Sequence, residues 1–518
     1  MLVRVRASTM MGIDAIPVEV ETDISQGLPS YTIVGLPGGP VRESGDRIRA
    51  AIRNSGFPFP GRKVTINLAP ADLRKESALL DLPIALSILS AEGVLPSEDL
   101  GKYLVAGELS LDGSLKPVRG VLSQGLLARR LALAGVLVPS PNASEASLVP
   151  GIDVISAATL RDAVSVLSGD ARPPAAEPDP RTAETTEVEL SDLRDVVGQP
   201  VARRALEIAA AGSHALLLAG PPGCGKTMLA ERIPGILPDF SDGEALETAQ
   251  VYSAAGEPPW PRLVSRRPFR APHHSVTPAG LIGGGNPPRP GEISFAHGGV
   301  LFLDEFSEFR REAREALRQP LESGEIRVAR AGNIYRFPCR FLLVAATNLC
   351  PCGNAGHPRR ICRCPPPLLT RFARNFSGPL LDRIDMSVSV PPLGGADWCG
   401  TGGGEPSAIV RERVKRCRTI QEKRYAGRTC RTNGTVRAPF SELASHLSTE
   451  ARSLLTRAAD RLGMSGRALC KVARIARTIA DLSGEETAAL PHVAEAIQYR
   501  LPDFTRQVAE KRESACTG

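Results

Sequence analysis

The chain has 518 residues, so we expect roughly two to four domains rather than one core. Its hydrophobic fraction of 42% and charged fraction of 23% are those of soluble globular proteins, and no apolar run approaches the ~18 residues that cross a bilayer. Because residues 1–6 also lack the apolar region of a signal peptide, we expect a cytoplasmic protein without membrane contact. The net charge of +7 is compatible with nucleic acid, whereas an aromatic content of 4% argues against a single-strand binder built on base stacking.

The N-terminal third alternates strand-like and helix-like patterns. Runs at 15–20 and 63–68 read as strands, and the segments 81–89 and 124–134 read as amphipathic helices, which together predict an α+β domain. The following stretch is rich in Pro, Ala, Glu and Thr and has no apolar periodicity, which is typical of a linker. The predicted division is residues 1–168 (N-terminal domain), 169–190 (linker), 191–392 (central α/β domain), 393–406 (Gly/Pro-rich linker) and 407–518 (basic helical domain).

The central domain contains the pattern G-x-x-x-x-G-K-T of a phosphate-binding loop. The apolar run Ala215–Ala219 enters it as a buried strand would, and the helix-like stretch Met228–Ile233 leaves it. In that context backbone N–H groups surround the phosphates, Lys226 reaches the β- and γ-phosphates, and the Thr227 hydroxyl holds Mg²⁺. The residues expected to bind ATP are Gly220, Pro221, Pro222, Gly223, Cys224, Gly225, Lys226 and Thr227.

Two further strand ends carry polar residues that suit nucleotide hydrolysis. The buried-strand pattern Gly299–Leu303 ends in Asp304 and Glu305. Asp304 suits coordination of Mg²⁺, and Glu305 projects to the other side of the strand, where it could polarise an attacking water. The strand-like run Phe341–Thr347 ends in Asn348, whose amide would sit beside the γ-phosphate and help to place the water. Taken alone, Asn348 would read as an ordinary turn residue.

Four of the eleven cysteines cluster in one short loop, with His357 between the two pairs. Four soft ligands could close a tetrahedral Zn²⁺ site, although the C-x-C spacing is tighter than the usual C-x₂₋₄-C. The alternative is a proline-pinned loop of reduced thiols. The candidate zinc ligands are Cys350, Cys352, Cys362 and Cys364.

The order of these motifs, followed by a helical C-terminus, resembles an AAA+ ATPase, and more specific strings resemble the magnesium-chelatase-like ATPases of the ComM/YifB family. The resemblance covers essentially the whole chain and implies a P-loop parallel-sheet core, a helical lid and an N-terminal domain like the proteolytic domain of Lon. It also implies a hexameric ring that hydrolyses ATP with Mg²⁺ and migrates branched or forked DNA during natural transformation. The strings that carry it are Val34–Pro37, Asn67–Asp72, Phe269–Ser275, Gly283–Gly285, Pro290–Ser294, Ser377–Asp385 and Ala476–Leu482.

Within this resemblance, two arginines are expected to complete the ATP site. Arg383 matches the family's arginine finger, which reaches the neighbouring subunit's ATP, unless it forms a local ion pair with Asp382 or Asp385. Arg467 fits the lid arginine that senses ATP in its own subunit, and Arg474 is the rival for that role.

For DNA, alternation around a Gly-Asn turn predicts a β-hairpin over Glu325–Phe337, with Arg327 in one strand and Arg330 and Arg336 flanking its tip. In a ring it would face the pore, although a solvated edge hairpin would carry the same charges. The Gly-rich segment Leu281–Gly285 is a second candidate for the pore.

A protease function fails on the residues that a Ser–Lys dyad needs. Against the Lon pattern, Leu79 stands at the nucleophile position and Leu122 at the lysine position, while Ser77 and Lys116 lie nearby but out of register. We therefore expect the N-terminal domain to be a structural or DNA-engaging platform. A DNA motor is the function that the sequence favours, and a motor subunit that remodels a protein partner is the alternative.

Overall fold

The computed structural model describes most of the chain. The predicted linker at 169–190 lies outside the described residues except for its first two positions, and so does most of the linker at 393–406. The described residues are 2–75, 77–170, 191–257, 266–330, 332–357, 359–374, 378–394, 404–428 and 430–500.

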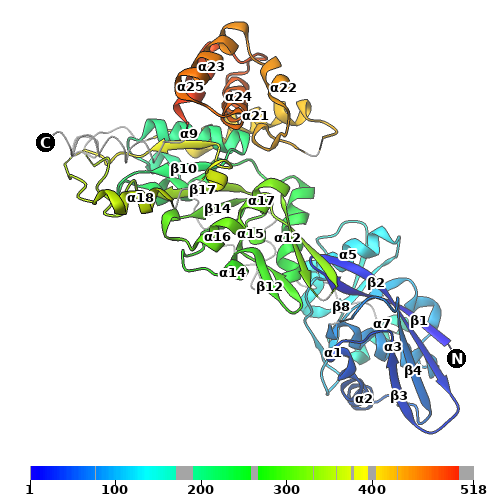
Figure 1. Cartoon of the computed structure of the whole chain (residues 1–518). Helices are drawn as coiled ribbons and strands as arrows, with labels where there is room; N and C mark the ends of the chain where they lie inside the picture. Colours follow the sequence, from blue (N-terminus) through cyan, green and yellow to red (C-terminus); the bar gives the residue numbers. More distant parts are fainter. Residues whose placement is uncertain are drawn as a thin grey trace.

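The N-terminal domain, residues 2–170, is α+β as predicted (Figure 1). Its larger sheet has the order β1-β2-β4-β3, in which β1, β2 and β4 pair antiparallel and β3 pairs parallel with β4. Alternate residues of β1 and β4 are buried, as expected for strands with one face on a core, and α3 packs on this sheet with every residue buried. These elements are β1 (Leu2–Met11), β2 (Asp14–Ser25), β3 (Ser30–Val34), β4 (Lys63–Ala69) and α3 (Asp81–Ala91).

A smaller parallel sheet, in the order β5-β8-β9, completes the N-terminal domain. Helix α5 packs on it and also faces the central domain. The remaining elements are β5 (Tyr103–Val105), β6 (Glu108–Leu109), β7 (Leu115–Lys116), β8 (Gly135–Pro139), β9 (Asp153–Ala157), α1 (Gly39–Arg42), α2 (Ser44–Asn54), α4 (Ser97–Leu100), α5 (Val121–Arg130), α6 (Ala143–Ala146) and α7 (Leu160–Leu167).

The central domain is built on a five-stranded parallel sheet in the order β11-β14-β17-β10-β18. Every residue of β10, β14 and β17 is buried, which explains their uninterrupted apolar runs. Because the strands are parallel, the polar residues that follow β10, β14 and β17 gather at one edge of the sheet. The strands are β10 (Leu216–Ala219), β11 (Phe269–Arg270), β14 (Val300–Leu303), β17 (Leu342–Thr347) and β18 (Met386–Ser389).

Helices cover this sheet, and two short hairpins extend from it (Figure 1). The hairpins are β12–β13 (Gly283–Gly285 and Pro288–Pro290) and β15–β16 (Glu325–Arg330 and Asn333–Pro338). The helices are α9 (Pro200–Gly212), α10 (Lys226–Glu231), α11 (Ile233–Ile236), α12 (Asp242–Ala255), α14 (Pro278–Ile282), α15 (Glu292–Phe295), α16 (Arg311–Ala316), α17 (Arg318–Ser323), α18 (Pro366–Arg374) and α19 (Gly378–Leu381).

The C-terminal domain is helical, as predicted, and shares one hydrophobic core with α9 and β10. Val472, Ile475 and Ile479 lie on the buried face of α24, and Leu482 packs against the same core. Its helices are α21 (Ser407–Arg424), α22 (Phe440–Ser445), α23 (Thr449–Leu462), α24 (Gly466–Ser483) and α25 (Leu490–Gln498). Among the described residues, every helix is too short or too polar to cross a membrane.

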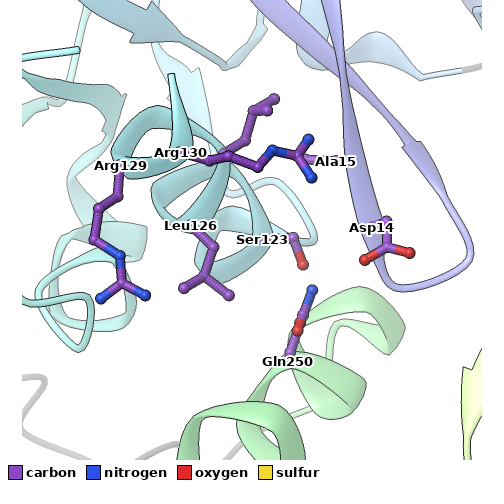
Figure 2. A pocket seen from close by; sticks show the side chains of 8 residues that line it. Asp14, Ala15, Ser123, Leu126, Arg129, Arg130 and Gln250 are labelled. Atoms are coloured by element: carbon purple, nitrogen blue, oxygen red, sulfur yellow. The ribbon is translucent and has the colours of Figure 1, made fainter. Parts of the chain in front are cut away.

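The N-terminal and central domains meet at the turn between β1 and β2. The carbonyl of Ile13 in this turn accepts hydrogen bonds from Ser123 Oγ of α5 (2.5 Å) and from Gln250 Nε2 of α12 (3.0 Å). Figure 2 shows Ser123 and Gln250 beside a cavity of about 410 Å³ that Asp14 and Arg130 also line. The two domains are therefore tied by polar contacts as well as by the apolar side chain of Ile13.

Candidate functional site

The phosphate-binding loop lies at the carboxyl end of β10, as its pattern predicts. Gly223 and Gly225 have φ of +76° and +90°, a left-handed conformation that favours glycine. A Cβ on Gly220 would lie 2.2 Å from the carbonyl oxygen of Val390, so only glycine fits beside β18. Helix α10 then begins at Lys226, whose ammonium donates to the carbonyls of Gly220 (2.9 Å) and Pro221 (2.8 Å).

The acidic pair after β14 and the amide after β17 converge on this loop. Thr227 Oγ1 donates to Asp304 Oδ2 (2.7 Å), which brings together the two predicted Mg²⁺ ligands. Lys226 Nζ also donates to Asn348 Oδ1 (3.2 Å). The structure thus gathers the predicted nucleotide-site residues at one edge of the sheet, where backbone N–H groups, a cation and oxygen ligands suit a metal-bound polyphosphate.

Glu305 projects from this edge with half of its side chain exposed and with a left-handed φ of +49°. The ring of His274 lies against its carboxylate, with Nδ1 3.3 Å from Oε2. His273 stacks beside His274, with ring centroids 4.0 Å apart. No sequence pattern places this histidine pair against residue 305, because the contact joins segments that are about 30 residues apart in the chain.

Arg383 lies in a loop that the C-terminal helix α24 holds. Lys471 Nζ donates to the carbonyls of Leu381 (3.1 Å) and Ile384 (2.7 Å), on either side of the arginine. The Arg383 guanidinium forms an ion pair with Glu322 of α17, not with the flanking aspartates that the sequence offered. Burial lowers the pKa of Lys471 to about 8.

The same helix places Arg467 beside Arg383 rather than beside the phosphate loop of its own subunit. Arg467 Nη1 donates to Asp382 Oδ2 (2.9 Å). The backbone N–H of Asp385 donates to Ala215 O at the start of β10, whereas the phosphate loop follows the end of that strand. A strand of this length spans about 13 Å, so in this structure Arg467 lies away from the phosphate loop of its own subunit, and its role in sensing ATP stays a prediction.

Arg474 belongs to a buried polar network beneath the Arg383 loop. It donates to Asp385 Oδ1 (3.2 Å) and to the carbonyl of Gly434 (2.8 Å). Burial alone would raise the pKa of Asp385, but Arg474, His214 and Lys471 outweigh it and lower that pKa. Arg474 is therefore engaged in holding the loop, which leaves Arg467 as the more exposed arginine of α24 at this face.

The predicted arginine hairpin forms, but Arg336 does not flank its tip. Arg330 pairs with Asn333 at the tip, so Asn333 belongs to β16 rather than to the turn, and Arg336 lies directly opposite Arg327. Arg327, Arg330 and Arg336 are all exposed, although Arg327 also pairs with Glu325.

The base of this hairpin rests against the N-terminal domain. A Cβ on Gly12 would lie 2.7 Å from the carbonyl oxygen of Arg336, and Ile13 joins the cluster that contains Tyr335 and Phe337. In the second pore candidate, Leu281 and Gly283 are buried, Ile282 and Gly284 are half-buried, and Gly285 is exposed.

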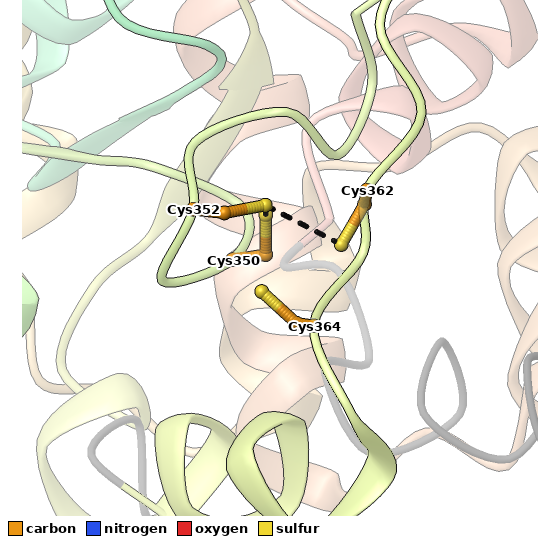
Figure 3. Close-up of side chains that lie close together, drawn as sticks. All are labelled: Cys350, Cys352, Cys362 and Cys364. Carbon is orange, nitrogen blue, oxygen red and sulfur yellow. Dashed lines mark hydrogen bonds between the residues drawn. The ribbon is translucent and has the colours of Figure 1, made fainter.

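The four predicted zinc ligands come together in the cysteine loop, residues 350–364 (Figure 3). Their sulfurs lie within 4.8 Å of one another, with Cys350–Cys352 at 3.4 Å and Cys352–Cys362 at 3.7 Å. Sulfurs at a Zn–S distance of about 2.3 Å are about 3.8 Å apart in a tetrahedron, so the cluster fits a closed structural site. The N–H of Ala355 also donates to Cys350 Sγ (3.2 Å), and the backbone N–H of Asn354 lowers the pKa of Cys352 to about 6.

The positions of a Lon-type dyad are apolar and buried in this structure. Leu79 is 2% exposed, and Leu122 is fully buried against Ala249 of α12. Ser77 accepts a hydrogen bond from the N–H of Leu79 (3.4 Å), and Lys116 lies exposed in the β6–β7 hairpin. These residues offer no nucleophile and base together.

Three family models match the chain. "Magnesium chelatase, subunit ChlI" matches residues 192–397, "Subunit ChlI of Mg-chelatase" matches 20–142, and "Magnesium chelatase, subunit ChlI C-terminal" matches 404–500. Between them they include the phosphate loop, the acidic pair, the cysteine loop and α24.

Curated relatives match over nearly the whole length. Competence protein ComM of Haemophilus influenzae is 44% identical over 95% of this chain and 96% of its own length. The YifB protein of Escherichia coli is 42% identical over 97% of both chains. A Lon protease of Salinispora arenicola is 26% identical over 30% of this chain and 21% of its own length.

Proposed function

Because the chain belongs to the ComM/YifB group of magnesium-chelatase-like AAA+ ATPases, we propose that it is a ring-forming motor that uses ATP to migrate branched DNA. The observation that carries this proposal is the separation of the catalytic groups. Lys226 and Glu305 lie at the carboxyl edge of the sheet, and Arg383 lies at the opposite edge. A complete site therefore needs two subunits, which supports a closed ring, proposed to be hexameric.

In this mechanism the loop Gly220–Thr227 cradles the phosphates of ATP, and Lys226 turns from its own carbonyls to the β- and γ-phosphates. Thr227 and Asp304 would hold Mg²⁺, which supplies charge neutralisation between the phosphate oxygens. Glu305 orients the attacking water and accepts its proton, and Asn348 helps to position that water beside Lys226.

Arg383 and Arg467 would act on the ATP of the neighbouring subunit. Both guanidinium groups lie at one face, held by Glu322 and Asp382 until a neighbour's phosphate offers a stronger acceptor. A trans arginine of this kind contributes about 10³–10⁵ in rate in comparable enzymes. An isolated subunit should therefore be nearly inactive.

DNA is the proposed substrate for two reasons. The most similar sequences compared include a protein named for competence, and the hairpin β15–β16 presents exposed arginines suited to a phosphate backbone. In this proposal residues 191–392 are the motor, residues 407–518 the lid, and residues 1–168 a platform that supports the hairpin.

We also propose that Cys350, Cys352, Cys362 and Cys364 hold a structural Zn²⁺. Purified protein should then carry about one zinc per chain, and Cys352→Ser should lose it. Elemental analysis of anaerobically purified protein that finds no stoichiometric zinc would rule this out.

The test of the proposed function is the ATPase rate with and without forked or four-way-junction DNA. A rise in rate, lost at high salt, is expected of a DNA motor. The alternative, a motor that remodels a protein partner, is favoured by the three family models named for a magnesium chelatase subunit. A rate that no DNA changes would contradict the DNA proposal and favour that alternative.

A further inference from the structure

The segment that follows β11 places His274 against the carboxylate of Glu305. Strand β11 pairs parallel with β14, and Arg270 lies opposite Leu301. The same offset, continued four residues beyond each of these positions, brings His274 level with Glu305. The pairing of the two strands thus accounts for the distance of 3.3 Å between His274 Nδ1 and Glu305 Oε2.

Side chains of β11 fix this strand against its neighbours. Phe269 stacks on Phe302 of β14, with ring centroids 5.9 Å apart. Arg270 forms a two-pronged ion pair with Glu292, in which both N–O distances are 2.8 Å, and its guanidinium lies over the ring of Phe295. The segment after β11 therefore starts from a fixed position.

A turn and a ring contact then orient His274. The N–H of Val276 donates to the carbonyl of His273 (3.0 Å), which closes a tight turn around His274. The rings of His273 and His274 stack with their centroids 4.0 Å apart, and the N–H of Ser275 donates to His273 Nδ1 (3.3 Å). The imidazole that faces Glu305 is therefore supported by its own neighbours in the chain.

The backbone of Glu305 is held firmly, whereas its side chain is long and mostly exposed. Its N–H donates to Asp304 Oδ1 (2.8 Å), and its φ of +49° is a conformation that a non-glycine residue keeps only where the surroundings enforce it. The side chain itself is 59% exposed. A general base has to lie within hydrogen-bond reach of the group whose proton it takes, so the carboxylate also has to be held in place.

We propose that His274 is a positioning residue that holds the carboxylate of Glu305 toward the attacking water. This role rests on the proposed ATP hydrolysis, in which Glu305 accepts the proton of that water. With a proton on Nδ1, the ring of His274 donates to Oε2, which leaves Oε1 to accept from the water. Because a displacement of about 1 Å at a reacting group can cost about 10²-fold in rate, a contact that fixes this carboxylate affects kcat without touching ATP.

The test measures kcat and KM for ATP hydrolysis by the full chain with Mg²⁺ and without DNA. His274→Ala should lower kcat about 10- to 100-fold, while KM and the binding of a fluorescent ATP analogue match the parent. His274→Asn, whose amide nitrogen takes the place of Nδ1, should regain most of the rate. His274→Gln, whose amide takes the place of Nε2, should regain less. His273→Ala is the matched control, and it should keep most of the parental kcat because the Nδ1 contact remains.

A double-mutant cycle shows whether His274 acts through Glu305. In the Glu305→Gln background, His274→Ala should cause little further loss, as measured with radiolabelled ATP. A loss of equal size in both backgrounds, a parental kcat in His274→Ala, or a higher KM with unchanged kcat would each overturn this inference. Because these rates are taken without DNA, a parent that DNA does not stimulate contradicts the proposed DNA motor and leaves the role of His274 standing. A parent that hydrolyses no ATP overturns both.

Discussion

The central and N-terminal domains differ at the positions where catalytic residues would be expected. In the central domain, Glu305 projects from a sheet edge with much of its side chain exposed. In the N-terminal domain, the two positions of a Lon-type dyad are buried leucines. Its buried polar groups hydrogen-bond to the surrounding backbone instead. Lys75 is fully buried and donates to the carbonyls of Gly35 (2.9 Å) and Leu68 (2.8 Å).

The hydrogen bonds of Lys75 connect the two N-terminal sequence strings that resemble the family. Lys75 joins the end of β3, where Val34–Pro37 begins, to the end of β4, where Asn67–Asp72 begins. Burial raises the pKa of Asp81 to about 6 even though Arg47 forms an ion pair with it. At the position of the dyad lysine, Leu122 instead contacts Ala249 of α12.

The largest expected contrast comes from matched changes in the two domains. Glu305→Gln should bind ATP but lower turnover by about 10²–10⁴-fold, because the amide cannot accept the proton of the attacking water. Lys116→Ala, which removes the lysine nearest in sequence to Leu122, should leave the ATPase rate unchanged. Steady-state hydrolysis with nucleotide-binding controls measures both. A Glu305→Gln protein with parental turnover would mean that another residue orients the water.

The second prediction tests whether each ATP site needs residues from two subunits. Arg383→Ala and Lys226→Ala should each lose hydrolysis, the arginine variant by about 10³-fold or more. Mixed together, they should regain activity where an intact Lys226 loop meets an intact Arg383 neighbour. An arginine that acts within its own subunit allows no such rescue. Mixtures that form joint rings by sizing yet stay inactive would contradict a trans Arg383.

The central strands of the ATP-site domain could be predicted because each has a local signal. The strands at 216–219, 300–303 and 342–347 were predicted to within a residue, since long apolar runs mark buried parallel strands. The phosphate loop and the clustering of the four cysteines follow from spacing. The positions that the sequence did not predict depend on contacts between segments that are far apart in the chain. The place of Arg467 is set by the docking of α24 on the Arg383 loop, and the contact of His274 with Glu305 joins the segments that follow β11 and β14.

The third prediction concerns a lysine introduced at residue 122, the position that the lysine occupies in the Lon pattern. Leu122→Lys buries an ammonium group against α12 in place of an apolar side chain, beside a Glu145 carboxylate that already accepts from Ser253 and from the N–H of Leu122. We expect a loss of about 3 kcal/mol or more at this contact. Hydrogen exchange of α12 reports it, and Leu122→Met is the volume-conserving control. No peptidase activity should appear, because Leu79 remains apolar. Unchanged protection of α12 would show that Leu122 does not hold the domains together.

The smallest prediction concerns the pH dependence of the Arg383 loop. Burial lowers the pKa of Lys471 from 10.5 in the unfolded chain to about 8. Between these two pKa values the unfolded chain binds more protons than the folded one. The charged lysine therefore lowers the free energy of unfolding by its full amount below about pH 8, and by less as the pH rises.

Lys471→Met removes this titration, at the cost of the two carbonyl contacts that flank Arg383. Relative to Lys471→Met, the parent should therefore gain about 1 kcal/mol of stability from about pH 8 to about pH 9. Denaturant unfolding of both proteins across this range, followed by a probe in α24, measures the difference. The difference between the two proteins is used because thiols and tyrosines that both proteins share also titrate in this pH range. A difference that stays constant with pH would mean that Lys471 keeps its charge in the folded protein, and the carbonyls of Leu381 and Ile384 would then be strong enough to offset its burial.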